Sequence, residues 1–303
     1  MECGSSNTSE RPSGSPSMND TAQTPAQSPG AIVLDGVRKG YGEDWSWQQV
    51  IESVSLDLPP GQFTAVVGPS GCGKTTLVNL LAGFERVDEG SILVDGRTVS
   101  GTSRDRMVVF QESALMPWLT TSQNVAFGPK LRGDLRGEEL NREIVRLLDK
   151  VGLADFKDKY PLQLSGGMQR RAELARAMIN SPSIMIMDEP FRGLDAMTRE
   201  LMQEFLLQLF EETGRTHFFV TSEIEEAIFL ADRLVVLSNR PVTVRQVIEI
   251  ALPRPREFHM LSTPEAYEYK REALEILHEE AMKSFGGDGA AQSGLVAAIS
   301  GQG

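Results

Sequence analysis

The stretch Gly68-Pro69-Ser70-Gly71-Cys72-Gly73-Lys74-Thr75-Thr76 carries the strongest structural signal in this chain. It matches the pattern Gly-x-x-x-x-Gly-Lys-Ser/Thr and lies between an apolar run, residues 63–67, and a helical run, residues 77–82. A strand, a glycine-rich turn and a helix in this order predict a loop whose N–H groups and helix N-terminus surround a phosphate. An ordinary glycine-rich turn would explain the same letters, but the flanking strand and helix favour the phosphate loop.

The residue types in this loop predict the phosphates of a nucleotide and Mg²⁺ as its ligands. We expect Lys74 to bridge the β- and γ-phosphates and the Thr75 hydroxyl to bind Mg²⁺. The residues expected to bind the nucleotide here are Gly68, Ser70, Gly71, Cys72, Gly73, Lys74, Thr75 and Thr76. Because Cys72 lies among N–H groups arranged for an anion, we also expect its thiolate form to be favoured.

The composition restricts the possible partners. With 303 residues, 40% of them hydrophobic, the chain can bury one large core or two unequal lobes. Its net charge of −12 argues against nucleic-acid binding and against electrostatic attachment to anionic lipid. No apolar stretch approaches the roughly 18 residues that a membrane span requires. Two cysteines, Cys3 and Cys72, suggest no disulfide framework and predict a reducing cytosol.

The pattern of residues also predicts the domain organisation. Residues 1–30 are polar and low in large apolar side chains, so we expect a disordered tail without a secretory signal. Short β-rich runs then predict a lobe that opens with antiparallel strands. These runs are residues 32–34, 53–58, 63–67 and 91–94. From residue 184 to 237, strands alternate with helical runs, which predicts a parallel sheet with crossover helices.

Two further segments show helical periodicity. Residues 138–152 place Leu140, Ile144, Val145, Leu147 and Leu148 on one predicted face. Residues 264–285 predict a last amphipathic helix, and we expect the glycine-rich stretch after it to be a flexible tail.

A second chemical element follows the apolar residues 184–187. Asp188 and Glu189 stand at the carboxyl end of this predicted strand, the edge at which parallel sheets bind ligands. We expect Asp188 to join the Mg²⁺ shell and Glu189 to polarise the water that attacks the γ-phosphate. A surface Asp-Glu turn before Pro190 is the alternative, and the upstream phosphate loop makes it less favoured. Met185 and Met187 are expected to fill the core.

The third element is Leu164-Ser165-Gly166-Gly167-Met168-Gln169-Arg170, which precedes a helical run. Ser165, Gly166 and Gly167 at a helix start predict a second anion site, made of a hydroxyl, N–H groups and the helix dipole. This stretch, followed closely by Met187-Asp188-Glu189-Pro190, resembles the signature of ABC-transporter ATP-binding subunits. The resemblance covers roughly residues 31–253 and is far more specific than either motif alone.

The resemblance implies an α/β P-loop NTPase fold with a RecA-like parallel-sheet core and an N-terminal antiparallel β subdomain. It further implies an inserted α-helical subdomain at about residues 112–180, and it leaves residues 254–303 as a C-terminal helix and tail. In the resembled family, two copies of the subunit form a head-to-tail dimer on ATP. Each signature then closes over the ATP held by the phosphate loop of the other copy.

Other positions acquire roles from the same resemblance. Gln111 matches a glutamine that contacts Mg²⁺ and relays the nucleotide state to the membrane subunit, although alone it could be a solvated loop residue. Tyr41 matches an aromatic residue that stacks on adenine. Trp45 and Trp47 lie close to Tyr41 in sequence, so any of these three rings could instead serve ordinary packing.

Two positions are expected at subunit contacts. Trp118 falls where the family's coupling surface meets the membrane subunit, with core packing as the alternative. The pair Leu194-Asp195 matches the loop that contacts the opposing copy.

Two departures from the family pattern stand near the predicted site. The family loop before Leu194-Asp195 usually reads Phe-Gly-Ala, and here it reads Phe191-Arg192-Gly193. Arg192 is therefore either a cation near the dimer seam or a solvent-facing side chain. Ser222 replaces the switch histidine; its hydroxyl can donate one hydrogen bond to the γ-phosphate but carries no charge. His217 begins the same predicted strand and is not expected to substitute. Because Glu189 is retained, we expect hydrolysis at a reduced or differently controlled rate.

The stretches around Trp118, Asp188 and residues 226–241 are most similar to importers for nitrate, sulfonate and taurine. The resemblance implies a peripheral ATPase on the cytoplasmic face of the inner membrane. This ATPase drives permease subunits, which receive their solute from a solute-binding protein. The transported solute is not readable from this subunit. The alternatives are a non-transport ABC ATPase, acting in translation or repair, and a regulatory nucleotide binder with little hydrolysis.

Overall fold

The computed structural model describes the backbone of Met1 and residues 30–299, and the side chains of residues 30–43 and 45–283 among them. The strands are β1 (Ile32–Tyr41), β2 (Gln48–Leu58), β3 (Phe63–Val67), β4 (Glu89–Val94), β5 (Arg97–Thr98), β6 (Arg106–Val109), β7 (Ile184–Asp188), β8 (Thr216–Val220), β9 (Arg233–Leu237) and β10 (Val242–Glu249). The α-helices are α1 (Lys74–Ala82), α2 (Thr121–Arg132), α3 (Gly137–Lys150), α4 (Gly166–Met178), α5 (Ala196–Thr213), α6 (Ile224–Leu230) and α7 (Pro264–Ile299). Short 3₁₀ helices lie at Asp44–Ser46, Ala154–Phe156, Pro161–Gln163 and Phe258–Ser262. The tail expected at residues 1–30 falls outside the described residues except at its two ends.

Within the described residues, the strands form one mixed sheet in the order β5-β4-β1-β2-β10-β9-β3-β8-β7-β6. The five strands from β9 to β6 in this order are parallel neighbours. Every residue of β3, β7 and β8 is buried, which suits a parallel sheet with both faces covered. The expected parallel core is therefore present, and its strands end at a common edge.

The other half of the sheet is antiparallel, as the sequence predicted. β1 pairs antiparallel with both β2 and β4, and β4 pairs antiparallel with β5. β10 joins the two halves, because it runs antiparallel to β9 and parallel to β2. The phosphate loop at the end of β3 thus lies near the junction of the two lobes.

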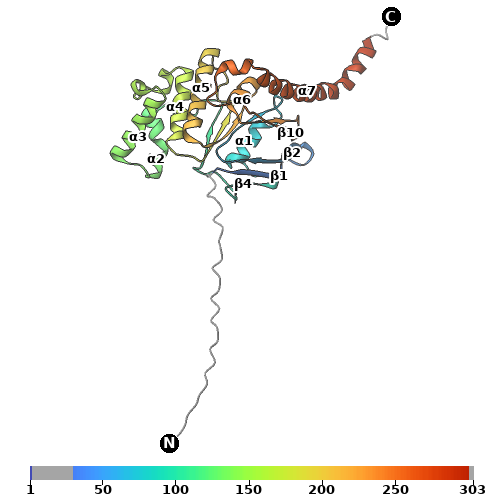
Figure 1. Cartoon of the computed structure of the whole chain (residues 1–303). Coiled ribbons are helices and arrows are strands. Elements are labelled where there is room, and N and C mark those ends of the chain that lie inside the picture. Colours follow the sequence, from blue (N-terminus) through green and yellow to red (C-terminus); the bar gives the residue numbers. More distant parts are fainter. Residues whose placement is uncertain (2–29, 300–303) are drawn as a thin grey trace.

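Helices α2, α3 and α4 fall between β6 and β7 in the chain and gather on the side away from β1, β2 and β4 (Figure 1). The buried residues of α3 include Leu140, Ile144 and Leu147, as predicted. The placement of Val145 on the same face is wrong, since its side chain is 57% exposed. Neighbouring residues on a helix point about 100° apart, so Val145 turns away from the apolar stripe.

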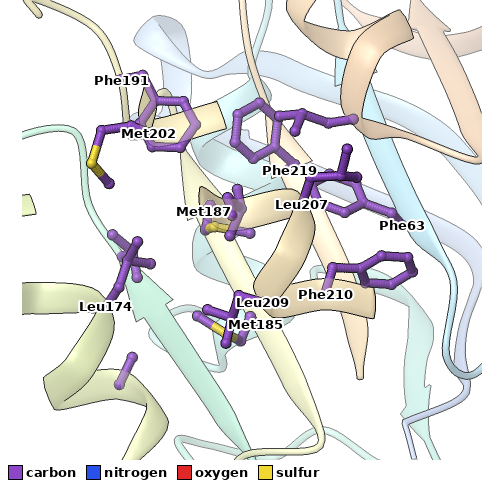
Figure 2. Packing of buried hydrophobic residues seen from close by; sticks show 14 of the residues in the cluster. Phe63, Leu174, Met185, Met187, Phe191, Met202, Leu207, Leu209, Phe210 and Phe219 are labelled. Carbon is purple, nitrogen blue, oxygen red and sulfur yellow. The ribbon is translucent and has the colours of Figure 1, made fainter. Parts of the chain in front are cut away.

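Aromatic and methionine side chains fill the centre of the larger core (Figure 2). The ring of Phe63 on β3 lies 5.3 Å from that of Phe210 on α5 and 5.7 Å from that of Phe219 on β8, measured between centroids. Met185 and Met187 on β7 are almost fully buried in the same cluster. The prediction that these two methionines fill the core is confirmed.

Helix α7 differs from the expected C-terminal helix in length. It continues to Ile299, so the predicted end of the helix at residue 285 is wrong, and the flexibility of the stretch after that residue stays a prediction. Each glycine lowers helix propensity by only about 1 kcal/mol relative to alanine, and alanine and leucine residues follow the glycines. The first part of α7 is held to the body by an ion pair of 2.5 Å between Lys270 and Glu225, and by Glu280, which accepts a hydrogen bond of 2.9 Å from the Asn239 N–H.

A buried arginine fixes the connection between β10 and α7. The Nη1 atom of Arg256 donates to three carbonyl oxygens at the end of α6, those of Ile228 (3.1 Å), Phe229 (3.1 Å) and Ala231 (2.7 Å). The last carbonyls of a helix have no donor within the helix, and a cation there also complements the helix dipole. Phe258 stacks on Phe229 with centroids 4.2 Å apart. The start of the C-terminal region is thus part of the fold.

This arrangement predicts that Arg256→Met will lower the free energy of unfolding by roughly 1.5 to 3 kcal/mol, because buried carbonyls lose a charged donor. Urea denaturation of the full chain measures the change. The control is Arg271→Met on the exposed face of α7, for which we expect a change below about 0.5 kcal/mol. Equal midpoints for the two variants would show that Arg256 contributes no special stability.

Candidate nucleotide-binding and hydrolysis site

The segment from Gly68 to Gly73 connects β3 directly to the first residue of α1. Gly73 is the N-cap of α1 with φ of 132°, and Gly71 has φ of 72°. Residues with a side chain rarely adopt these angles. Gly68 is restricted by space instead, because a Cβ there would lie 3.0 Å from the Leu237 Cβ and 3.1 Å from the Cys72 Sγ. The glycine pattern therefore corresponds to a tight turn that ends on a helix N-terminus.

Lys74 places a positive charge inside this turn. Its Nζ donates to the carbonyl oxygens of Gly68 (2.9 Å) and Pro69 (3.0 Å), and the residue is 8% exposed. Beside it lies an open cavity of about 250 Å³. The lining residues are Ser70, Gly71, Gly73, Lys74, Thr75, Thr76, Gln111, Asp188, Glu189, Arg192 and Arg240. We call this space the phosphate-loop cavity; it brings most of the predicted loop residues together with Gln111, Asp188 and Glu189.

Asp188 and Thr75 form the part of the wall suited to a metal. Asp188 Oδ2 accepts a hydrogen bond of 2.8 Å from Thr75 Oγ1. Burial raises the pKa of Asp188, and the hydrogen bond from Thr75 and the charge of Lys74 oppose that rise. Hydroxyl and carboxylate oxygens are ligands that Mg²⁺ prefers, and a cation here would offset the cost of the buried carboxylate. Among the described residues no group of three or more His, Cys, Asp or Glu could hold a metal alone, so phosphate and water would complete the shell.

Glu189 leaves the strand in an unusual backbone conformation. Its φ of 44° lies in the left-handed region, which a residue with a side chain adopts at an energetic cost. The conformation is held on both sides, because the Glu189 N–H donates to the Val220 carbonyl at 2.8 Å and the Arg192 N–H donates to the Glu189 carbonyl at 3.1 Å. The Glu189 carboxylate pairs with the Arg192 guanidinium at 2.9 Å. The turn directs the carboxylate toward the cavity that Asp188 also lines.

The segment that carries Gln111 is attached to α4. Arg170 of α4 donates to the carbonyl oxygens of Phe110 at 2.7 Å and Gln111 at 2.6 Å. Arg170 is buried and pairs with Glu173 at 2.6 Å, and Glu173 also accepts the N–H of Ala114. We did not identify this pair from the sequence. The sequence signal for this pair is two opposite charges three residues apart on a helix that must bury one face.

The signature residues stand at the start of α4. Ser165 is the N-cap, and its Oγ accepts a hydrogen bond of 3.3 Å from the Met168 N–H. Gly167 is required by packing, since a Cβ there would lie 2.5 Å from Cγ2 of Thr198 on α5. Ser165 and Gly166 are exposed, and none of the three signature residues lines the phosphate-loop cavity of its own chain. The second predicted anion site therefore faces outward.

The aromatic residues near β1 have separate environments. Tyr41 is partly exposed and donates to Glu85 at 2.5 Å; burial and this contact raise its pKa to about 12. Trp47 rests on Gly40, where a Cβ would lie 2.3 Å from the indole ring. Trp45 is exposed. Tyr41 does not line the phosphate-loop cavity, so its contact with adenine stays a prediction.

Ser222 and His217 lie at opposite ends of the β8 region. Ser222 is exposed and lines a second, smaller cavity that it shares with Glu189 and Arg192; it does not line the phosphate-loop cavity. His217 is fully buried, stacks on Phe63 with centroids 5.1 Å apart, and has its pKa lowered to about 4 by burial. His217 is therefore a core residue and not a substitute for the missing histidine.

Cys72 contradicts the expectation of a favoured thiolate. The residue is 2% exposed and belongs to the apolar cluster that includes Leu77 and Leu237. Burial raises the pKa of its thiol, and the opposing charge of Lys74 is a smaller effect. The prediction is wrong because the side chain points into the core behind the turn. Cys72 supports the loop and does not line the phosphate-loop cavity.

Arg240 is a lining residue that sequence reasoning missed. It follows β9, and its neighbour Asn239 is held by Glu280 of α7. The available signal was its position after an apolar strand of the parallel sheet, because such strands deliver side chains to the ligand edge.

The expected contact residues occupy exposed or helix-terminal positions. Trp118 is 71% exposed, which excludes the alternative of core packing. Asp195 is the N-cap of α5 and accepts a hydrogen bond of 3.0 Å from the Thr198 N–H. The role of Leu194 and Asp195 at a subunit contact stays a prediction.

A glycine-rich phosphate loop, the hydrogen-bonded pair of Thr75 and Asp188, and the adjacent Glu189 line one cavity, and this combination is typical of a phosphate-loop nucleotide hydrolase. A family model described as ABC transporter matches residues 51–192. An uncharacterized ABC transporter ATP-binding protein of Methanocaldococcus jannaschii is 43% identical over 255 residues, covering 84% of this chain and 93% of that protein. A nitrate import ATP-binding protein of Synechococcus elongatus is 42% identical over 252 residues, covering 82% of this chain and 92% of that protein.

A taurine import ATP-binding protein of Ruegeria pomeroyi is 46% identical over 205 residues, covering 68% of this chain and 75% of that protein. A solved dimeric ATP-binding cassette in a post-hydrolysis state, bound to ADP and Pi, has a TM-score of 0.64 and 29% identity, and covers 73% of this chain and 100% of that chain. The chain belongs to the ATP-binding subunits of ABC transporters. The predicted fold and the predicted class of ATP hydrolase are thereby confirmed.

The environment of Cys72 predicts slow thiol modification. In a Cys3→Ser variant of the full chain, maleimide should react with Cys72 at pH 8 at least about tenfold more slowly than in urea, because burial lowers both access and the thiolate fraction. Since the pKa of the Cys72 thiol is raised in the folded state, its labelling rate should continue to increase at pH values above the pKa of an exposed thiol. Rapid labelling at pH 7 that Mg-ATP suppresses would restore the original expectation of a favoured thiolate.

Proposed function

We propose that this chain is the ATP-hydrolysing subunit of an importer and that it works as a dimer with a second copy. The observation that carries the proposal is the shared cavity of Lys74, Thr75, Asp188 and Glu189, in which the Thr75 hydroxyl donates to Asp188 at 2.8 Å. A cation that can bind phosphate, a hydroxyl–carboxylate pair that can bind a metal and a candidate base all line this cavity. These are the parts that phosphoryl transfer to water requires.

In this proposal the loop residues from Gly68 to Thr76 bind the phosphates, with Lys74 at the β- and γ-phosphates. Thr75, Asp188 and Gln111 would hold Mg²⁺, which when bound neutralises phosphate charge. The Glu189 carboxylate accepts a proton from water as the water oxygen forms a bond to the γ-phosphorus. The bond from that phosphorus to the bridging oxygen breaks, and ADP and inorganic phosphate leave.

A second copy supplies the remaining half of the site. Ser165, Gly166 and Gly167 stand at the N-terminus of α4, outside the phosphate-loop cavity of their own chain. Such a helix start suits the phosphates of an ATP held by another copy. The dimeric cassettes among the structural neighbours support this arrangement.

The transport role rests on the relatives and on exposed surface. Proteins named as taurine, nitrate and aliphatic sulfonate import ATP-binding proteins are similar to this chain, so we propose a small-solute importer of this kind. No helix of the described residues is both long and apolar enough to cross a membrane. By analogy with these relatives, permease subunits that receive solute from a solute-binding protein would hold the chain at the cytoplasmic face of the membrane. Exposed Trp118 is the proposed contact with the permease.

The neutral hydroxyl of Ser222 favours one alternative, a regulatory nucleotide binder with little turnover. Phosphate release separates these functions, because a binder takes up ATP without multiple turnovers. A non-transport ABC ATPase would hydrolyse ATP but would not be recovered with permease subunits from solubilised membranes.

The role of Glu189 predicts that Glu189→Gln will keep ATP binding within about twofold and lower steady-state phosphate release by at least about a hundredfold, since an amide cannot accept the proton. ATP-bound dimers should accumulate on gel filtration with Mg-ATP. Lys74→Ala is the comparison variant and should lose affinity for a fluorescent ATP analogue. Unchanged phosphate release by Glu189→Gln would exclude Glu189 as the base.

A further inference from the structure

Arg192 makes the direct contact with the candidate base. Its Nη1 lies 2.9 Å from Glu189 Oε2, and the side chains of Arg192 and Glu189 are 63% and 11% exposed. The carboxylate is thus mostly withdrawn from water, whereas the arginine reaches it from the open side. Because the Arg192 N–H also donates to the Glu189 carbonyl at 3.1 Å, one short turn fixes both groups relative to each other.

The position of the pair is unusual within the site. Glu189 and Arg192 are the two described residues that line both the phosphate-loop cavity and the second cavity, which also contains Ser222. Arg199, a further cation of the second cavity, donates to the Leu194 carbonyl at 3.1 Å. Ser222 contributes no charge. The guanidinium of Arg192 therefore supplies the positive charge next to the base at the boundary of the two cavities.

The donor geometry of arginine suits a bridging role. A guanidinium has five N–H donors in a rigid plane, and the contact with Glu189 engages Nη1. The remaining donors can bind phosphate oxygens, which accept such planar pairs well. A lysine in the same place would offer one compact charge and no rigid plane whose two edges can bind two different groups.

We propose that Arg192 is a positioning and phosphate-binding residue of the hydrolysis reaction. One edge of its guanidinium orients the Glu189 carboxylate, and the other edge binds the terminal phosphate of ATP and supplies the charge that Ser222 lacks. This inference rests on the proposed function, in which Glu189 is the base.

The test measures phosphate release and nucleotide affinity for the purified full chain. Arg192→Ala should lower kcat by about tenfold or more, because the transition state loses a charge-assisted hydrogen bond. The affinity for ADP should stay within about twofold, since ADP lacks the terminal phosphate. Arg192→Lys should recover part of kcat. Ser222→His should raise kcat more in the Arg192→Ala background than in the parent, because both changes act on one missing charge.

The matched control is Arg146→Ala. Arg146 forms an i,i+3 ion pair with Glu143 at 2.6 Å on α3, and its side chain is 59% exposed, close to the exposure of Arg192. This variant removes the same charge and should keep parent turnover. The proposal is overturned if Arg192→Ala matches or exceeds the parent rate, if ADP affinity falls as much as kcat, or if Ser222→His acts equally in both backgrounds. Turnover that survives Glu189→Gln would instead exclude Glu189 as the base, whereas a parent chain that takes up ATP without multiple turnovers would refute the proposed function.

Discussion

Val66 of β3 lies opposite Val220 of β8, and Asp188 of β7 lies opposite the same valine from the other side. This register places the ends of three strands at one level, so the turns that follow them meet. Hydrogen bonds continue the register past the strands, from the Thr221 N–H to the Val66 carbonyl at 3.1 Å and from the Glu189 N–H to the Val220 carbonyl at 2.8 Å. A slip of one residue would turn the side chain of Asp188 to the opposite face and separate it from Thr75. The site therefore depends on strands that are buried on both faces.

The parts of the site that the sequence predicted are those encoded by local pattern. Gly71 and Gly73 require conformations that few other residues adopt, and Asp188 ends a run of apolar residues of strand length. Both signals are contained within a few residues. α2 and β10 were not predicted. α2 contains Gly128 and Pro129, and β10 is half-exposed along most of its length, so neither shows a clear apolar period.

The remaining features depend on contacts between distant segments. Arg170 and Gln111 are far apart in sequence, and periodicity gives no information on which carbonyl a buried guanidinium will meet. The pKa of Cys72 also could not be predicted from its local sequence. Its loop sequence indicates the N–H groups around it, but its pKa depends on whether the side chain faces the cavity or the core behind the loop. Even the short-range pair of Arg192 and Glu189 follows from a left-handed backbone angle at a residue that usually avoids one.

The attachment of Arg170 to the carbonyls of Phe110 and Gln111 gives the helical group a mechanical property. Because Ser165 caps α4 and Arg170 lies in the second turn of the same helix, the outward-facing signature and the Gln111 wall of the cavity are attached to one helix. A displacement of α4 would therefore reach both the Gln111 wall of the cavity and the exposed residues at the start of the helix.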